Sequence, residues 1–281
     1  KIVFYFTNCL NPTVNKQPND IQRIPIKSSD NKTEEFIANL AKTNIKIKKH
    51  LCSFSITETN FTQNPLYISA HANLKERLLE YLNYENHLLT QVLLNEAIIN
   101  EEVFKVYELS ESDKAMVLEK EGESVGGLHV ELEAKEAYLS YFAENFDLSL
   151  CKAYIDALHV KAFDVDKKAQ IIKAFESLYQ ANNDLEEFCT KQEVNPINVW
   201  HWFKESKTLP KQRMNIIALE FLVDMIREIL AEDEDGIVPL VPNAGEKVLL
   251  QRVHEKFYQK GFSDAQTRRF YALFGKEPES H

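Results

Sequence analysis

The strongest constraint on the fold is a long run of regularly spaced apolar residues in the first half of the chain. Within residues 72–109, the apolar positions that recur at spacings of three, four and seven are Leu74, Leu78, Leu82, Leu89, Val92, Ile99, Val103 and Phe104. This period places them on one face of an α-helix. We therefore expect one long amphipathic helix or a pair of helices, which either packs into a core or acts as an arm that spaces two modules.

The rest of the sequence also favours helix. The chain of 281 residues has only 7 glycines, and three of these, Gly122, Gly126 and Gly127, mark a boundary. Beyond it, helices are expected near residues 131–145, 149–162, 166–181, 184–193, 196–205, 210–232, 245–260 and 263–275. The predicted fold class is mainly α, a helical C-terminal domain preceded by an irregular α/β region.

The N-terminal region is less regular. The opening run Lys1–Phe6 is apolar but too short to span a membrane, and it is interpreted as the end of an element that begins upstream. Because residues 11–30 contain three prolines, we expect an extended or looping stretch with a short edge strand at 24–26. Residues 33–51 follow a helical pattern with a basic outer face.

Charge is unevenly distributed along the chain. Residues 1–60 hold nine Lys or Arg and five acids, whereas the remainder carries a net charge of −14. The overall charge of −10 argues against a chain that coats DNA along its whole surface. The basic and acidic parts are expected to have different partners.

Signatures of catalytic and metal chemistry are not legible. The four cysteines, Cys9, Cys52, Cys151 and Cys189, form no CxxC pair, which argues against a zinc site or a disulfide framework and suits a reducing cytosol. We expect no histidine to pair with acids at metal-ligand spacing, and no Ser-His or Cys-His arrangement stands out. The sequence thus predicts no catalytic, cofactor-binding or metal-binding residue.

Residues 185–205 have the spacing of two helices that cross at a tight turn. Small Cys189 is expected at the crossing, with Asn195 and Pro196 capping and starting the second helix. Val194, Val199 and Trp202 would fill the space between the helices. The turn falls on Glu193, where such turns usually have glycine with a positive φ.

This helix pair has two interpretations, a DNA-reading helix-turn-helix or a purely structural bend. A local basic excess favours DNA contact and consists of Lys204, Lys207, Lys211 and Arg213. Because residues two apart on a helix diverge, we expect Trp200 and Trp202 not to share the core, with one of them exposed or at an interface.

One motif near the N-terminus resembles a known family. Residues 11–21 read Asn-Pro-Thr-Val-Asn-Lys-Gln-Pro-Asn-Asp-Ile, followed by Ile24-Pro25-Ile26. This resembles the Asn-Pro-Thr-x-Asn-x-Gln-x-Gly-Asp-Ile…Ile/Leu-Pro-Val stretch of BREX phage-exclusion DNA-adenine methyltransferases and related type II restriction-modification methylases. The matching residues are Asn11, Pro12, Thr13, Asn15, Gln17, Asp20, Ile21 and Pro25, whereas Lys16 and Asn19 replace the family's Phe and Gly.

Weaker similarities to the same family continue downstream. They are Ser53-Phe54…Phe61…Pro65-Leu66, Asn100-Glu101…Phe104…Tyr107-x-Leu109, and Asp235-Gly236-Ile237-Val238-Pro239-Leu240 with Gly245-Glu246. The segment Asn64–Tyr67 looks like the Asn-Pro-Pro-aromatic loop that holds a flipped adenine, but no hydrophobic strand precedes it and we reject it as such.

The resemblance implies a cytoplasmic parent enzyme that transfers a methyl group from S-adenosylmethionine to adenine N6 at a defined DNA site. Residues 1–70 would be the end of its target-recognition region, 71–130 a long helical connector and 131–281 a helical C-terminal domain. Lacking the catalytic motifs, this chain alone would be inactive, with double-stranded DNA and other defence-complex subunits as its partners. The alternative is a non-enzymatic helical protein–protein interaction module of a defence complex.

The resemblance places the N-terminal basic residues beside the DNA path. We expect Lys16, Gln17, Arg23, Lys27 and Lys32 to contact DNA there, with a solvated loop edge as the alternative. Together with Lys204, Lys207, Lys211 and Arg213 they form the predicted set of DNA-binding residues.

Overall fold

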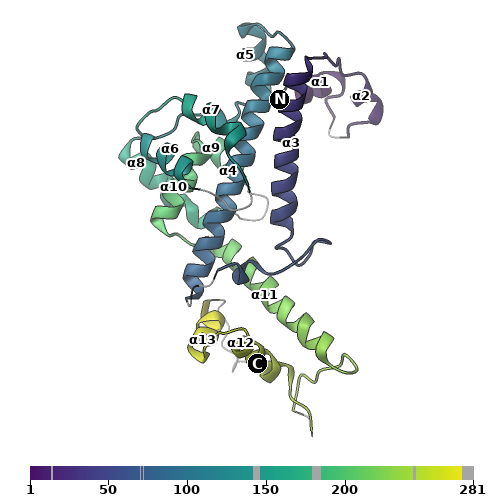
Figure 1. The fold of residues 1–281 in the computed structure, drawn as a ribbon, viewed down its shortest axis with the longest axis vertical. Helices are drawn as coiled ribbons and strands as arrows, with labels where there is room; N and C mark the ends of the chain where they lie inside the picture. Colours follow the sequence, from purple (N-terminus) through teal and green to yellow (C-terminus); the bar gives the residue numbers. More distant parts are fainter. Residues whose placement is uncertain are drawn as a thin grey trace. The chain divides into compact units, whose positions relative to one another are not determined.

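The structure is a computed structural model that describes residues 1–13, 15–69, 71, 73–141, 146–178, 185–242 and 245–273. Over these residues it contains thirteen α-helices and no strand, which confirms a mainly α fold (Figure 1). An isolated parallel bridge joins Val130 to Val160. Among the described helices none is long and apolar enough to cross a membrane.

The chain divides into two compact units that are interleaved in sequence. Unit 1 comprises residues 1–48, 86–172 and 184–205, and unit 2 comprises residues 49–85, 173–183 and 206–281. The two longest early helices, α3 (Asn31–Cys52) and α4 (Leu74–Val106), each supply residues to both units. Each unit is therefore assembled from three stretches of the chain that are separated in sequence.

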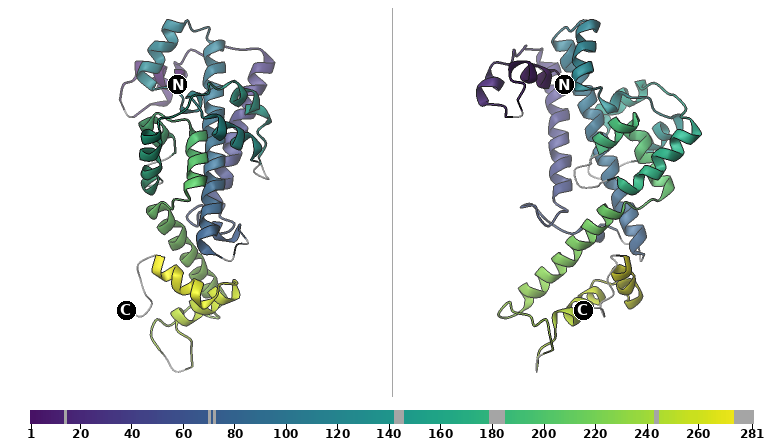
Figure 2. Two further views of the ribbon diagram at one scale, coloured as in Figure 1. Left: turned by 90° about the vertical axis from the view of Figure 1, so that its left-hand side faces the viewer. Right: turned by 180° about the vertical axis from the view of Figure 1, so that it is seen from behind.

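Unit 1 is built around parts of α3 and α4 that run side by side (Figures 1 and 2). Asn44 of α3 donates to the carbonyl of Val92 and accepts from Asn95 of α4. The single helix α4 confirms the one-helix alternative for the periodic segment. The further helices that begin in this unit are α1 (Ile2–Leu10), α2 (Pro18–Gln22), α5 (Glu111–Glu121), α6 (Leu132–Ser140), α7 (Ser149–Ala157), α8 (Val165–Ala174), α9 (Leu185–Gln192) and α10 (Pro196–Ser206).

Unit 2 has its own aromatic core. Its helices are the short η1 (Pro65–Tyr67) and η3 (Phe175–Ser177), then α11 (Lys211–Glu232), α12 (Leu249–Gln259) and α13 (Asp264–Leu273). Phe221 of α11 packs against Tyr67, Phe257 and Phe262. The acidic end of α11 is neutralised within the unit, because Lys256 pairs with Glu232 and Arg252 with Asp233.

The N-terminal region departs from the sequence prediction. The stretch 11–30 contains the helix α2, whose first residue is Pro18. Proline is tolerated at this position, because the N–H group that it lacks would have no partner within the helix. No strand occurs at 24–26, so that prediction was wrong. Helices α1 and α5 were not predicted, although Ser110 and Asp113 form a capping box at the start of α5. Parts of the expected helices, at 142–145, 179–181, 184 and 274–275, lie outside the described residues.

Helix α10 lies in the interior of unit 1. All of its residues from Pro196 to Phe203 are buried. Trp200 packs against Tyr138 and Tyr141, and Trp202 packs against Phe163. The prediction that one of the two tryptophans is exposed is therefore wrong, because partners cover the diverging faces of the helix.

His87 of α4 is buried beside α10. Its ring stacks on Tyr138 with centroids 4.6 Å apart and contacts Trp200 edge to face. Burial, with a smaller contribution from the nearby charge of Lys204, lowers the pKa of His87 from 6.5 to about 4. The folded chain thus holds a neutral imidazole at a pH where the unfolded chain is protonated.

This difference predicts a pH-dependent stability. As pH falls from 6.5 to 4, the unfolded state binds a proton at His87 and the folded state does not, so the free energy of unfolding falls. The loss from this one group amounts to about 3 kcal/mol and stops below the folded pKa. Replacing His87 with Phe should flatten the pH dependence over this range.

Both tryptophans of the chain belong to unit 1, so urea unfolding followed by tryptophan fluorescence reports on the relevant unit. The matched control is His71→Gln, which removes an exposed histidine. Equal pH dependence in the wild type and His87→Phe would contradict the buried neutral histidine.

A close backbone contact in unit 1 gives a second prediction. A Cβ added at Gly126 would lie 2.7 Å from the Leu93 carbonyl oxygen and 3.0 Å from the Ala97 Cβ of α4. Gly126→Ala should therefore lower the free energy of unfolding by about 1–3 kcal/mol. The control Gly127→Ala meets only the flexible end of Tyr154, at 3.3 Å, and should lose less. Urea unfolding of the two variants checks this, and equal losses would contradict it.

Candidate functional site

The residues that carry the family resemblance form one hydrogen-bonded loop in unit 1. Asn11 accepts from the Thr13 hydroxyl at 2.6 Å and donates to the Asp20 carboxylate at 2.7 Å. The same carboxylate accepts from the backbone N–H of Gln17 at 2.9 Å, and these bonds, that of Asn11 first, lower the pKa of Asp20. Asn11, Thr13 and Asp20 thus hold the loop that precedes α2. Val14 of this motif lies outside the described residues.

Two of the predicted DNA-binding residues in this region are engaged within the protein. The Lys16 ammonium donates to the carbonyls of Thr7 and Asn11 and to the side chain of Asn8. Lys16 thereby caps the C-terminus of α1. Lys27 forms an ion pair with Glu108 at 2.9 Å. Their charges are therefore partly compensated by protein groups.

The other three predicted residues of this region, Gln17, Arg23 and Lys32, have exposed side chains. The backbone N–H of Lys32 donates to Asp30 at the start of α3, and the residue is exposed. Among the described residues, neither Arg23 nor Lys32 forms an ion pair.

Exposed lysines on the outer faces of α3 extend this basic region. Residues 36–52 contain four lysines and no acid. Lys42, Lys46 and Lys48 of unit 1 are exposed, whereas Leu40 and Ile47 of the same helix are fully buried. Within the described part of the chain, none of the three lysines forms an ion pair, and Lys46 lies over the ring of Phe146. The predicted basic outer face of this helix is confirmed.

The second predicted basic group is divided between the two units. Lys204 belongs to unit 1, and its ammonium lies 5.3 Å from the ring centroids of Trp200 and Tyr141. Lys207, Lys211 and Arg213 belong to unit 2. Lys207 and Lys211 are exposed, but Arg213 is committed to an ion pair with Glu85 of the same unit.

The turn and the cap predicted within residues 185–205 are confirmed. Helices α9 and α10 are joined by a tight turn at Glu193, which has a φ of 51°. The N–H of Val194 donates to the carbonyl of buried Cys189, and the side chain of Asn195 caps α10 by accepting from Ile197 at 2.9 Å. The turn and the cap therefore match those of a helix-turn-helix bend.

The burial of α10 supports the structural interpretation of this bend over the DNA-reading one. A recognition helix must present an open face to the major groove. Pro196–Phe203 has none, because side chains of unit 1 surround it. The Asn198 amide, for example, donates to the His129 carbonyl and accepts from the Glu131 N–H.

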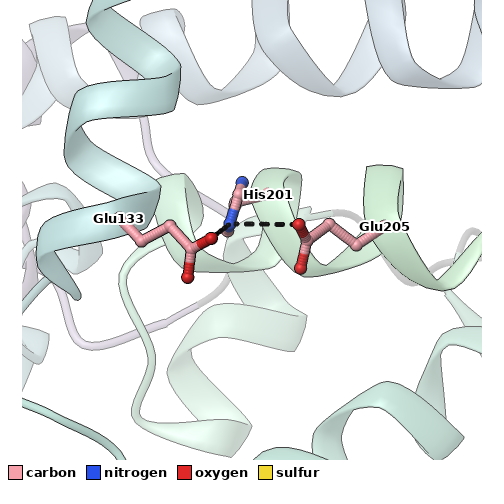
Figure 3. Close-up of side chains that lie close together, drawn as sticks. All are labelled: Glu133, His201 and Glu205. Atoms are coloured by element: carbon pink, nitrogen blue, oxygen red, sulfur yellow. Dashed lines mark ion pairs between the residues drawn. The ribbon is translucent and has the colours of Figure 1, made fainter.

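The structure also assembles a group that the sequence reading missed. Glu133 of α6 and His201 and Glu205 of α10 point toward one another, with the imidazole between the two carboxylates (Figure 3). Their potential ligand atoms lie within 4.8 Å of one another. The expectation that no histidine is paired with acids at metal-ligand spacing was wrong, because His201 and Glu205 are four residues apart on one helix face. Glu133 is too distant in sequence for any spacing to reveal.

The Asn64–Tyr67 segment is structural, in agreement with its rejection as a base-holding loop. Asn64 is fully buried in unit 2, where its side-chain oxygen caps η1 by accepting from Leu66 at 3.0 Å. Its amide nitrogen donates to the carbonyl of Ile217. Neither end of this amide is open to a base.

A cavity of about 760 Å³ opens in unit 1. Its lining mixes charges of both signs, including Glu123, His129, Lys161, Asp164 and Lys167.

Comparison with known proteins gives no relative from which to transfer a function: no family model, no curated protein and no solved structure matches the chain.

The strained turn at Glu193 gives a third prediction. A non-glycine residue in the left-handed region is disfavoured, so Glu193→Gly should raise the free energy of unfolding by up to about 1 kcal/mol. The control Lys191→Gly, at an exposed position inside α9, should lower it by about 1 kcal/mol. Urea unfolding followed by tryptophan fluorescence measures both. The turn geometry would be refuted if both glycines destabilised the chain equally.

Proposed function

We propose that this chain is the C-terminal specificity and helical portion of a cytoplasmic, site-specific adenine-N6 DNA methyltransferase of the BREX or type II restriction-modification kind. In this role it contacts the phosphate backbone of double-stranded DNA through the exposed lysines of α3. The support from sequence is the motif at residues 11–26, and the support from structure is the set of exposed lysines on the helix that follows it.

The observation that carries the DNA contact is the uncompensated charge on α3. Lys42, Lys46 and Lys48 are exposed, and no acid occurs between residues 36 and 52. The chain as a whole carries a charge of −10, so these lysines stand out against an acidic background. Phosphate neutralisation by such side chains supplies affinity that is independent of base sequence.

The methyl donor is assigned to the parent enzyme. Asn64, in the segment that looks like the base-holding loop of the family, has both polar side-chain atoms engaged within the protein. Methyl transfer in this proposal is the work of a catalytic domain outside this chain, and this chain positions DNA.

The test is a gel-shift series with a duplex oligonucleotide at increasing salt. The triple variant Lys42→Gln/Lys46→Gln/Lys48→Gln should bind more weakly than the wild type. The slope of log affinity against log salt should become shallower by about 3, since each lost phosphate contact removes close to one counterion. The full chain is used, because a cut at residue 130 would divide unit 1.

A matched control removes the same amount of charge elsewhere in unit 1. Lys152→Gln/Lys161→Gln/Lys167→Gln replaces three exposed lysines outside α3 and should keep the wild-type slope. If the two triple variants lose affinity equally, α3 is not the contact surface. If the wild type shows no salt-dependent binding, the DNA role fails, which would favour the alternative of a protein–protein interaction module of a defence complex.

A further inference from the structure

The cluster of Glu133, His201 and Glu205 has the composition of a metal site. The Nε2 atom of His201 lies 3.7 Å from a carboxylate oxygen of Glu205 and 4.0 Å from one of Glu133. Two of the three residues come from consecutive turns of α10 and the third from the first turn of α6 (Figure 3). All three belong to unit 1, so its internal packing fixes their arrangement.

The imidazole of His201 is the observation that points to a ligand. Its side chain is only 7% exposed, and neither ring nitrogen has a hydrogen-bond partner in the described structure. Buried polar atoms are usually satisfied, and because the ring nitrogens of buried His87 also lack partners, what distinguishes His201 is the pair of carboxylates beside it. Here Nε2 faces two carboxylates at distances too long for hydrogen bonds, which leaves room for an ion between them.

The charge of the two carboxylates is also uncompensated by cationic side chains. Within the described residues, neither Glu133 nor Glu205 pairs with a lysine or arginine. Lys204, beside Glu205 in the chain, instead directs its ammonium over the rings of Trp200 and Tyr141. A bound divalent cation would supply the missing positive charge.

We propose that Glu133, His201 and Glu205 bind a divalent transition metal ion of the Zn²⁺ class. One imidazole nitrogen and two carboxylate oxygens suit such an ion, whereas Mg²⁺ and Ca²⁺ prefer ligand sets of oxygen alone. Ligands arranged tetrahedrally about Zn²⁺ lie roughly 3.3 Å apart, given metal–ligand bonds of about 2.0–2.1 Å. The two carboxylates need to move inward by less than an ångström or so, and both belong to exposed, flexible side chains, 74% and 55% accessible.

Metal binding here would join α6 to α10. Three protein ligands leave at least one coordination position for water or an anion, and the exposed side of the cluster gives access to it. The site lies on a helix that packing already holds rigidly, so the metal would add a clamp to unit 1. It does not involve α3, and it is independent of the proposed DNA contact.

The test is isothermal titration of the full, chelator-treated chain with ZnCl₂, and separately with MgCl₂. The wild type should bind one Zn²⁺ at this site, and Zn²⁺ should raise the melting temperature of unit 1 followed by tryptophan fluorescence. The variants Glu133→Gln and Glu205→Gln each remove one ligand and should weaken Zn²⁺ binding at least about tenfold. The double variant should lose both this binding step and the rise in melting temperature.

The control is Glu136→Gln, which neutralises another exposed acid of α6 and should bind Zn²⁺ as the wild type does. Because the substituted glutamates are exposed, the variants should fold as the wild type does. Unchanged melting temperatures in the presence of chelator verify this. Zn²⁺ binding that is unaffected in the double variant would overturn the proposal. So would equal weakening in Glu136→Gln, or Mg²⁺ binding as tight as that of Zn²⁺.

Discussion

The arrangement of unit 1 depends on the burial of α10. Burying a helix on all sides is favourable only if its polar side chains find partners, since an unpaired buried amide costs a few kcal/mol. Asn195 and Asn198 meet this requirement by bonding to the backbone of residues 126–131. Trp202 does so by donating its indole N–H to Glu131 at 3.0 Å. These bonds tie the segment before α6 to α10, which brings Glu133 near His201.

The same burial favours one of the two interpretations that the sequence left open. Because α10 has no exposed face through Phe203, the structure supports a bend at Glu193 that serves packing, even though its turn and cap have the expected geometry. Basic charge is instead available on α3, where packing uses one face and leaves lysines on the others. His201 differs from the asparagines of α10, because its ring nitrogens lack the hydrogen bonds that would make its burial purely structural.

Local signals in the sequence predicted local structure well. The apolar period of residues 72–109 predicted α4, and Asn195 followed by Pro196 predicted the start of α10. The failures concern features that depend on distant partners. A helical wheel separates Trp200 from Trp202, but it cannot show that Tyr138 and Phe163 cover both faces. Likewise, the spacing of His201 and Glu205 was legible in the sequence, whereas the approach of Glu133 depends on the tertiary fold.

In the proposed function, α10 is internal and α3 contacts DNA. Lysine acetylation of the full chain, with and without duplex DNA and read by mass spectrometry, tests both halves in one measurement. We expect DNA to reduce the reactivity of Lys42, Lys46 and Lys48, while that of Lys204 on α10 stays unchanged. Protection of Lys204 with no change on α3 would contradict the account and return the DNA contact to the helix pair.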